Sequence, residues 1–335
     1  MSVLPKEFNI IKDYLEEKNM EKRQLGKDGP FLTTIGLGTW AIGGPWEFGW
    51  GPQDDKQSID TIKKALDYGI NWIDTAAAYG LGHSEEIVGK AIKGQRQNVF
   101  LATKCGILWN EKGEVKRTHT KETIMKEVEN SLRRLKTDYI DLYQIHWPDP
   151  KNPVEESWEA MVRLKEQGKV RYIGVSNFDV PLLEKCEKIH HINSLQPPYS
   201  LLNRDIETKI LPWCLEHGTG VVVYSPMQSG LLTGKFDKSR LAKDDWRHRS
   251  PYFQEPQLSK NLKFVEALKS ISARYGKTVA QLAIAWVLMH PAVTSAIVGA
   301  RRPDQVDEII GGAGWKIEQE DIKQIENLSK KILSN

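Results

Sequence analysis

The sequence contains few cysteines, no long apolar run and almost no net charge. Its three cysteines, Cys105, Cys186 and Cys214, lie far apart and form no CxxC pair or Cys/His cluster, which argues against a disulfide framework and a zinc site. The longest apolar run extends only from Leu282 to Met289, whereas a membrane span needs about 18 residues or more. Lys and Arg number 47 and Asp and Glu 44, so the net charge of +3 gives no electrostatic case for nucleic acid or an anionic membrane as a partner.

The N-terminus also lacks the apolar core of a secretory signal, because the first twenty residues mix charged and apolar side chains. Together with the small number of cysteines, this predicts a protein of the reducing cytoplasm. The composition is otherwise ordinary for a folded chain, with 335 residues, 40% of them hydrophobic, and 11 tryptophans that need burial. This length allows one large domain or two medium ones.

Short apolar, β-rich runs alternate with longer amphipathic patterns along the chain. Strands are expected at residues 34–38, 71–73, 99–103, 139–145, 170–175, 193–196, 220–224 and 294–298. Helices are expected at residues 54–68, 84–92, 120–135, 154–166, 180–189, 206–216, 258–275, 279–289, 303–310 and 318–332. Eight strand-helix units in about 300 residues predict an α/β fold, a (β/α)8 TIM barrel over residues 21–335 with an extra C-terminal helix. Residues 1–20 are expected to form an N-terminal arm, and the Asp28-Gly29-Pro30 turn predicts a hairpin at the barrel bottom.

An open, doubly wound sheet is the alternative fold, and one motif bears on it. Residues Gly36 to Ala41 match G-x-G-x-x-A, the pattern of a dinucleotide-binding turn. Such a turn leads directly from a strand into a helix, whereas here Gly43-Gly44-Pro45 follows and no helical pattern begins before about Asp54. The motif therefore lacks its structural context, and the barrel is the better interpretation.

Functional groups in a barrel of this type lie at the C-terminal ends of the strands. Asp74 follows the second expected strand, Tyr79 lies in the next loop, Lys104 ends the third strand and His146 ends the fourth. Burying several titratable groups together is costly unless they serve a purpose. These four side chains therefore predict an active site.

The four residue types suit the protonation of a carbonyl oxygen while a hydride reaches the carbon. A phenol has a pKa near ~10, and a lysine ammonium beside it lowers that value. We therefore expect Lys104 to lower the pKa of Tyr79, Asp74 to hold Lys104 in place, and His146 to orient the substrate oxygen. The sequence contains no evident activated Ser or Cys and no set of metal ligands.

Several motifs resemble those of one protein family. The matching segments are Gly38-Thr39-Trp40, Asp74-Thr75-Ala76-x-x-Tyr79-Gly80, Lys104, Gln144-Ile145-His146-Trp147-Pro148, Gly174-Val175-Ser176-Asn177 and Tyr224-Ser225-Pro226. Together they resemble the aldo-keto reductase superfamily, in the right order and over roughly residues 21–330. Ser200-Leu201-Leu202-Asn203-Arg204 and Gly299-Ala300-Arg301 are similar to the bacterial branch of general-stress reductases, inositol-linked oxidoreductases and potassium-channel β subunits.

The resemblance implies a nicotinamide cofactor, NADP(H) first and NAD(H) as the alternative. It implies that Tyr79 is the general acid in reduction and the base in oxidation. The residues implied to bind the cofactor are Gly38, Thr39, Trp40, Asp74, Ser176, Asn177, Gln196, Tyr224, Ser225, Pro226, Gln228, Gly230, Lys235, Gly299, Arg301, Gln305 and Glu308. Ser176, Asn177 and Gln196 are implied to bind the carboxamide, and Tyr224 to stack on the nicotinamide ring.

The adenine end is implied to lie on the loops after the last two strands. The pyrophosphate is expected on residues 225–235, with Lys235 as a point charge. The 2′-phosphate is expected on Arg301, because a guanidinium matches a phosphate bidentately. Gln305 and Glu308 occupy the ribose and adenine positions, and Gln305 departs from family members that carry Arg there.

Tryptophans dominate the loops expected around the substrate. Trp46, Trp109 and Trp147 are expected to line a pocket for small or aromatic aldehydes. Arg204, or the cluster Arg247-His248-Arg249, is either an anion site or a set of solvated surface charges.

The leading functional hypothesis is an NADP(H)-dependent aldo-keto reductase that acts on a small aldehyde or ketone, with neither nucleic acid nor membrane as a partner. Two alternatives remain open. One is a redox-sensing regulatory subunit that binds NADP(H). The other is a polyol dehydrogenase of the inositol type, in which the same residues act in reverse. The sequence predicts no oligomeric state.

Overall fold

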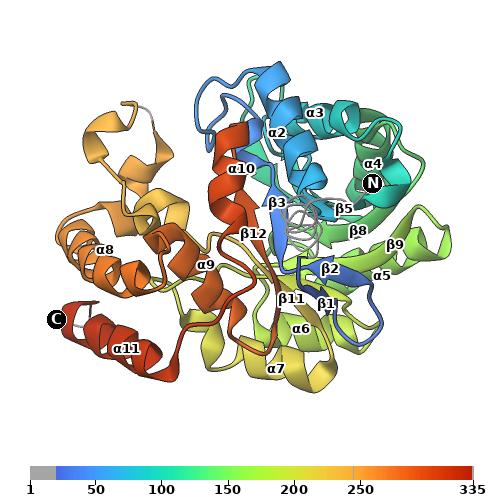
Figure 1. Ribbon diagram of the computed structural model, residues 1–335. Helices are drawn as coiled ribbons and strands as arrows, with labels where there is room; N and C mark the ends of the chain where they lie inside the picture. The colour runs from blue at the N-terminus through green and yellow to red at the C-terminus, as the bar shows by residue number, and fades with distance from the viewer. Residues whose placement is uncertain (1–19, 244, 334–335) are drawn as a thin grey trace, which may run out of the picture.

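Eight parallel strands close into a barrel in the computed structural model, which describes residues 20–243 and 245–333. Around the barrel they are β3 (Ile35–Gly38), β4 (Trp72–Asp74), β5 (Phe100–Cys105), β8 (Ile140–Ile145), β9 (Val170–Ser176), β10 (Ser194–Gln196), β11 (Gly220–Val223) and β12 (Val293–Gly299). Each expected strand has a counterpart, so the predicted TIM barrel is confirmed (Figure 1). The predicted arm lies outside the described residues except for Met20, and the boundary beside it stays a prediction.

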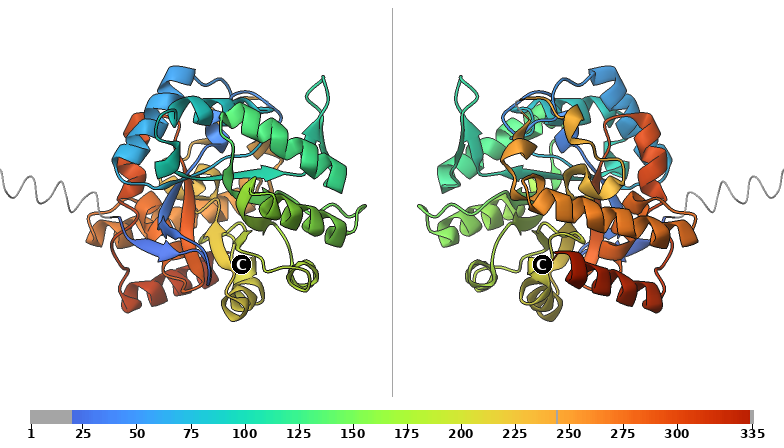
Figure 2. Two further views of the ribbon diagram at one scale, coloured as in Figure 1. Left: turned by 90° about the vertical axis from the view of Figure 1, so that its right-hand side faces the viewer. Right: turned by 90° about the vertical axis from the view of Figure 1, so that its left-hand side faces the viewer.

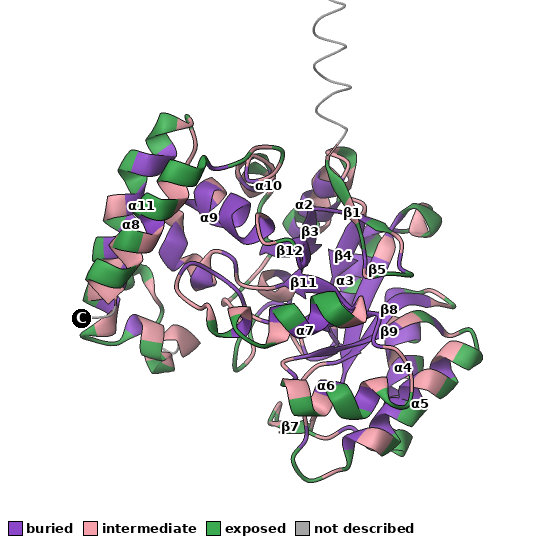
Figure 3. Ribbon diagram, turned by 90° about the horizontal axis from the view of Figure 1, so that it is seen from below, coloured by how far each residue is buried: buried purple, intermediate pink, exposed green. Residues whose placement is uncertain are grey.

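Helices surround the barrel, with buried faces toward the strands and exposed faces outward (Figure 3). They are α2 (Asp55–Asp67), α3 (His83–Ala91), α4 (Lys121–Leu135), α5 (Val154–Glu166), α6 (Val180–Glu187), α7 (Ile210–His217), α8 (Gln257–Arg274), α9 (Val279–Leu288), α10 (Pro303–Ile310) and α11 (Gln319–Leu333). The extra C-terminal helix is α11, which packs along α8 (Figure 1). In the described part of the chain, no helix combines the length and the apolar character that crossing a membrane requires.

Successive side chains of each strand point alternately into and out of the barrel, which gives two hydrophobic cores. Outward side chains pack under the helices, whereas inward side chains such as Trp72 fill the barrel. Gly36 is required beside this indole, because a Cβ there would lie 2.0 Å from the Trp72 ring. At the N-terminal end, Leu25 and Leu32 close the barrel interior. They belong to the predicted hairpin, whose strands are β1 (Lys22–Gln24) and β2 (Phe31–Thr33).

Two features depart from the sequence-based expectation. A second hairpin, β6 (Ile107–Trp109) with β7 (Val115–Arg117), follows β5 and stands out from the body of the protein (Figure 2). The expected helix at 206–216 begins only at Ile210, because a short 3-10 turn, Asp205–Glu207, precedes it. The long polar segment after β11 contains only short 3-10 turns before α8.

Candidate active site

Side chains from consecutive strand ends and the loop after β4 meet at the C-terminal mouth of the barrel. Lys104, near the end of β5, donates hydrogen bonds from Nζ to Oδ1 of Asp74 at 2.6 Å and to the carbonyl of Thr75 at 2.9 Å. It also donates to the hydroxyl of Tyr79 at 3.1 Å. The ring of Tyr79 lies edge-on to the imidazole of His146, with 5.7 Å between the centroids. The four residues singled out in the sequence therefore form one cluster.

The Asp74–Lys104 ion pair is buried, with side chains only 3% and 0% exposed. Burial raises the pKa of Asp74, against the opposite effects of Lys104 and of Gln196, whose amide donates to Oδ2 of Asp74 at 2.8 Å. Burial lowers the pKa of Lys104, against the carboxylates of Asp74 and Glu85, which favour the charged ammonium. Each charge of the pair therefore depends on the other, because neither is solvated.

The pKa of Tyr79 shifts in the direction opposite to the prediction. Burial of the phenol and the charge of Asp74 raise this pKa well above its usual value. The predicted lowering by Lys104 is wrong because burial of the phenol has the largest effect, and Asp74, 2.6 Å from the Lys104 ammonium, raises the pKa further. The phenol thus faces a nearly neutral ion pair in a desolvated site, and it stays protonated at neutral pH.

His146 is held neutral at the barrel mouth. Burial and the nearby charges of Lys104 and Arg117 lower its pKa well below the usual value. A neutral imidazole has one N–H donor and one acceptor nitrogen. The backbone of His146 is fixed by Asn177, which donates from Nδ2 to the His146 carbonyl at 3.0 Å.

A chain of hydrogen bonds links the residues expected to bind the nicotinamide end. The hydroxyl of Ser176 donates to the carbonyl of Gln196 at 2.8 Å. Asn177 donates from Nδ2 to the Ser176 hydroxyl at 3.0 Å, and the Tyr224 hydroxyl donates to Oδ1 of Asn177 at 2.8 Å. Because Gln196 also bonds Asp74, this chain is continuous with the ion pair.

Four residues in the loop after β11 have a left-handed backbone, and three of them, Ser225, Gln228 and Gly230, are expected to bind the cofactor. The φ angles are 56° at Ser225, 46° at Gln228, 51° at Ser229 and 98° at Gly230. Backbone of this kind turns successive N–H groups to one side and makes an anion-binding concavity. The Ser200 hydroxyl donates to Oε1 of Gln228 at 2.9 Å, which anchors the loop to the barrel.

The residues expected at the adenine end bond to one another or to nearby backbone. Nζ of Lys235 lies 3.1 Å from Oε1 of Glu308 at the surface. The side-chain oxygen of Gln305 accepts from the backbone N–H of Arg301 at 2.7 Å and of Arg302 at 3.2 Å. Gln305 therefore caps the beginning of α10 and, in this arrangement, is directed at the protein's own backbone.

Arg301 is partly buried and bonds only neutral oxygens, all on residues 50–53. Its pKa is lowered by burial and by the charges of Arg302 and Arg247. No carboxylate within the described ranges forms an ion pair with it. A partly buried guanidinium without a counter-ion is a fitting place for an anion.

The other expected cofactor residues lie at strand ends or in the loops that follow. Gly38 ends β3 and Gly299 ends β12, and the two are register partners in the barrel. Thr39 is buried, Trp40 begins the next 3-10 turn, and Pro226 is buried after β11. All of these positions lie at the C-terminal side of the barrel.

The three tryptophans expected to bind substrate come from different loops. Trp46 lies in the loop before α2, and Trp109 lies in β6 with the guanidinium of Arg134 5.8 Å from its ring. Trp147 follows His146 directly, and the guanidinium of Arg117 lies 4.4 Å from its ring centroid. Their role in substrate binding stays a prediction.

Arg204 is not available as an anion site. Its guanidinium pairs with Glu207 at 2.9 Å and with Glu326 of α11 at 2.7 Å, and it lies over the ring of Trp286. Its role is therefore to tie α11 to the 3-10 turn before α7.

Contacts between tryptophans of distant loops, which the sequence did not predict, lie at the barrel mouth. The ring centroid of Trp50 lies 5.9 Å from that of Trp40 and 6.5 Å from that of Trp246, and the guanidinium of Arg247 lies 4.2 Å from the Trp50 ring. Trp246 and Arg247 come from the irregular segment after β11. That segment carries no periodic pattern, so no sequence signal places it over the loop before α2.

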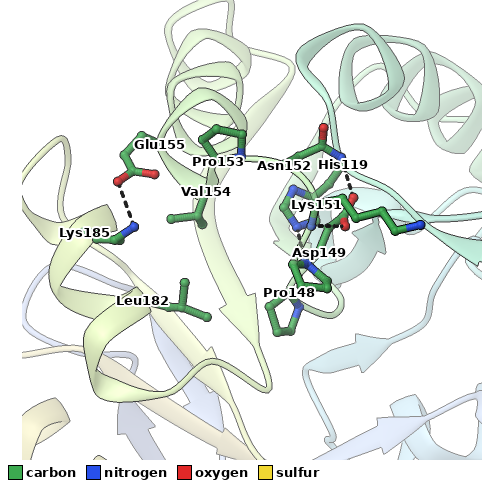
Figure 4. A pocket seen from close by; sticks show the side chains of 11 residues that line it. His119, Pro148, Asp149, Lys151, Asn152, Pro153, Val154, Glu155, Leu182 and Lys185 are labelled. Carbon is green, nitrogen blue, oxygen red and sulfur yellow. Dashed lines mark hydrogen bonds and ion pairs between the residues drawn. The ribbon is translucent and has the colours of Figure 1, made fainter.

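A separate cavity of about 510 Å³ lies where the loop after β8 meets α5 and α6 (Figure 4). In its wall, both ring nitrogens of His119 are bonded, one to the Ser157 hydroxyl at 2.6 Å and the other to the backbone N–H of Asp149 at 2.7 Å. Lys185 and Glu155 pair at 3.2 Å at its edge. These groups satisfy one another, so the cluster at the barrel mouth is the better candidate for chemistry.

Comparisons with known proteins agree with this site. Residues 34–330 match the model of the Aldo/keto reductase family. The chain is 43% identical over 320 residues to aldo-keto reductase YhdN of Bacillus subtilis (strain 168), and the aligned part covers 94% of this chain and 96% of the relative. It is 36% identical over 328 residues to the NADH-specific methylglyoxal reductase of Escherichia coli (strain K12), covering 93% and 99%.

A solved structure shows the same relationship. The glycerol dehydrogenase AKR11B4 from Gluconobacter oxydans superimposes with a TM-score of 0.86 at 41% identity, over 94% of this chain and 96% of that one. A match of this extent, together with the clustered Asp74, Tyr79, Lys104 and His146, shows that the chain belongs to the aldo/keto reductase family of nicotinamide-dependent oxidoreductases.

Proposed function

We propose that the protein reduces a small aldehyde or ketone to the alcohol with NADP(H), and that Tyr79 supplies the proton. One observation carries this proposal: Nζ of Lys104 lies 3.1 Å from the Tyr79 hydroxyl oxygen. A lysine ammonium has no acceptor, so Lys104 must be the donor in this bond. The phenolic proton of Tyr79 therefore remains available for a substrate oxygen.

Tyr79 acts as the general acid in reduction. Its raised pKa keeps the phenol protonated at neutral pH. An alkoxide is a stronger base than a phenolate, so the proton transfers as negative charge builds on the substrate oxygen. Lys104 stabilises the phenolate that remains, and Asp74 keeps Lys104 charged. In alcohol oxidation, the same phenolate takes up the proton.

His146 orients the substrate. Its lowered pKa keeps the imidazole neutral, so one ring nitrogen donates a hydrogen bond while no full positive charge competes with Lys104. A second donor beside Tyr79 holds the carbonyl oxygen in line with the phenolic proton, which favours the reactive geometry.

The nicotinamide cofactor, when bound, supplies the hydride that adds to the carbonyl carbon. Two observations fit such a nucleotide: the left-handed loop after β11, and Arg301 without a counter-ion. We assign the carboxamide to Ser176, Asn177 and Gln196, and the ring face to Tyr224, because a flat aromatic fixes a flat ligand. The glycine-containing loops after β3, β11 and β12 carry the rest of the expected binding set.

We assign the 2′-phosphate of NADP(H) to Arg301. The relative from E. coli is described as NADH-specific, so this preference needs its own test. Replacing Arg301 with Ala is expected to weaken NADPH binding by about 10- to 100-fold, the value of a charge-assisted hydrogen bond. NADH binding should change much less. An equal loss for both nucleotides, measured by fluorescence quenching, would reject the assignment.

Small carbonyl compounds and polyols are the substrates to test first, because the relatives are described as a methylglyoxal reductase and a glycerol dehydrogenase. The test is a panel of aldehydes, ketones and polyols assayed with NADPH and NADH. Faster turnover of aldehydes with NADPH supports the proposal. Turnover of polyols alone favours the polyol dehydrogenase, and nucleotide binding without any turnover favours the redox-sensing subunit.

A further inference from the structure

Arg301 is held by a network that phosphate binding alone does not require. Its Nε donates to Oε1 of Gln53 at 2.8 Å, Nη1 to the carbonyl of Trp50 at 3.1 Å and Nη2 to the carbonyl of Pro52 at 2.6 Å. Gln53 returns a bond from Nε2 to the carbonyl of Arg301 at 2.8 Å. Four hydrogen bonds thus join the loop after β12 to residues 50–53, which we call the Trp50 segment.

A count of donors shows that Arg301 is not saturated. A guanidinium carries five N–H groups, and the Trp50 segment uses three of them. The two remaining N–H groups lie one on each terminal nitrogen. Arg301 is therefore able to hold the Trp50 segment and an anion at the same time.

The Trp50 segment belongs to the loop that also carries Trp46. Besides Arg301, it is held by aromatic contacts of Trp50 with Trp40 and Trp246. The indole N–H groups of Trp46, Trp50 and Trp246 are buried without a partner in the described part of the chain. Unpaired buried donors are costly, and the bonds to Arg301 offset part of this cost.

We propose that Arg301 couples the 2′-phosphate of the cofactor to the Trp50 segment and thereby to substrate affinity. This inference rests on the proposed function, which assigns that phosphate to Arg301. A phosphate on the two free N–H groups restrains the guanidinium, and a restrained guanidinium holds the segment more firmly. By linkage, the factor by which the phosphate favours the firmly held segment equals the factor by which that held segment raises phosphate affinity.

The first test measures hydrogen exchange in peptides that cover residues 46–54. The probes are 2′,5′-ADP and 5′-AMP, which differ by the 2′-phosphate. We expect 2′,5′-ADP to slow exchange in this loop and 5′-AMP to leave it unchanged. Gln53→Ala should still bind 2′,5′-ADP by calorimetry, while losing most of this protection.

Two further variants sharpen the comparison. Arg301→Lys keeps the positive charge but lacks the planar fork that bonds several acceptors at once, so it should bind the nucleotide without protecting the loop. Lys56→Ala removes an 86% exposed side chain that pairs with Asp60, and it should behave as the unmodified protein. Equal protection in Gln53→Ala, Arg301→Lys and the unmodified chain overturns the proposal.

Steady-state kinetics give an independent readout. The aldehyde KM should be about 5-fold lower or more with NADPH than with NADH, the lower end of typical coupling factors. In Gln53→Ala the two KM values should converge while kcat is unchanged, because Gln53 bonds none of the four proposed catalytic residues. A KM ratio unchanged by Gln53→Ala also overturns the coupling.

These readouts separate the inference from the proposed function. Carbonyl turnover without any loop protection by 2′,5′-ADP leaves the reductase in place and removes the coupling. Loop protection without turnover of any carbonyl keeps the coupling and removes the reductase. Absence of 2′,5′-ADP binding removes the coupling and the assignment of the phosphate to Arg301, while turnover decides the reductase separately.

Discussion

The Lys104 ammonium donates to the hydroxyl oxygen of Tyr79 at 3.1 Å, and never the reverse. Its other two protons go to Asp74 at 2.6 Å and to the carbonyl of Thr75 at 2.9 Å. All three donors of the ammonium are thus used, and among the described residues the phenol of Tyr79 donates to none. The proton of Tyr79 is consequently free for a substrate oxygen at the barrel mouth.

Replacing Tyr79 with Phe removes that proton and little else. We expect kcat for aldehyde reduction to fall by about 10²- to 10⁴-fold, the usual contribution of a general acid. Nucleotide affinity, followed by fluorescence quenching, should be unchanged within a few-fold. Near-normal turnover by this variant would remove Tyr79 from the mechanism, and loss of nucleotide binding would point to a distorted site instead.

Replacing Lys104 with Met leaves the carboxyl group of Asp74 buried without its partner. We expect the free energy of unfolding to fall by about 3–5 kcal/mol, because breaking one side of a buried ion pair costs that much. The double variant Asp74→Asn/Lys104→Met should recover most of this loss in urea denaturation, yet remain inactive. An exposed control, Lys56→Met, should change little. Equal stability of the single and double variants would show that the pair is not electrostatically coupled.

The fold was predictable from the sequence because short apolar strand patterns and longer amphipathic helix patterns alternate regularly along the chain. The cluster of Asp74, Tyr79, Lys104 and His146 followed from the rule that barrel strands end at one face. The pKa of Tyr79 was not accessible, since its direction depends on burial and on how closely Asp74 offsets Lys104.

Contacts between distant loops were also beyond the sequence. The bond between Arg301 and Gln53 joins two loops without periodic pattern, and neither residue type indicates the other as its partner. The β6–β7 hairpin was missed for a related reason. Its strands have three residues each and none of these six residues is buried, so no alternation of buried and exposed side chains marks them.

His146 makes stability depend on pH in a predictable direction. Its pKa in the folded chain is well below the value near ~6.5 expected when unfolded. Above pH ~6.5, His146 is neutral in both the folded and the unfolded chain, and its contribution to stability is complete. As the pH falls below it, only the unfolded chain takes up the proton, so stability falls by at most about 1.4 kcal/mol per pH unit.

His119 also has a lowered pKa and contributes in the same direction. Comparison with His146→Gln isolates the effect of His146, because His119 is present in both proteins. We expect urea denaturation curves of the unmodified chain to lose more stability between pH 6.5 and 5 than those of His146→Gln. Parallel pH dependences for the two proteins would contradict the neutral, buried state of His146.

Glu127 of α4 supplies the opposite dependence. Both of its carboxylate oxygens accept from the backbone N–H of Gly106 at 3.1 Å, at the point where β5 ends. Burial raises the pKa of Glu127 to about 8, against that hydrogen bond and the charge of Arg134. The folded chain therefore holds a proton that the unfolded chain releases near ~4.3. The stabilising contribution is complete below the unfolded value and is lost as the pH rises through about 8.

Glu127→Gln stays neutral at every pH and should abolish this loss. Between pH 6 and 9 we expect the unmodified chain to lose stability relative to Glu127→Gln in urea denaturation. Glu129→Gln, on the same helix but half-exposed and paired with Lys169, serves as the control and should keep the dependence of the unmodified chain. A pH dependence shared equally by all three proteins would show that Glu127 is already ionised when folded.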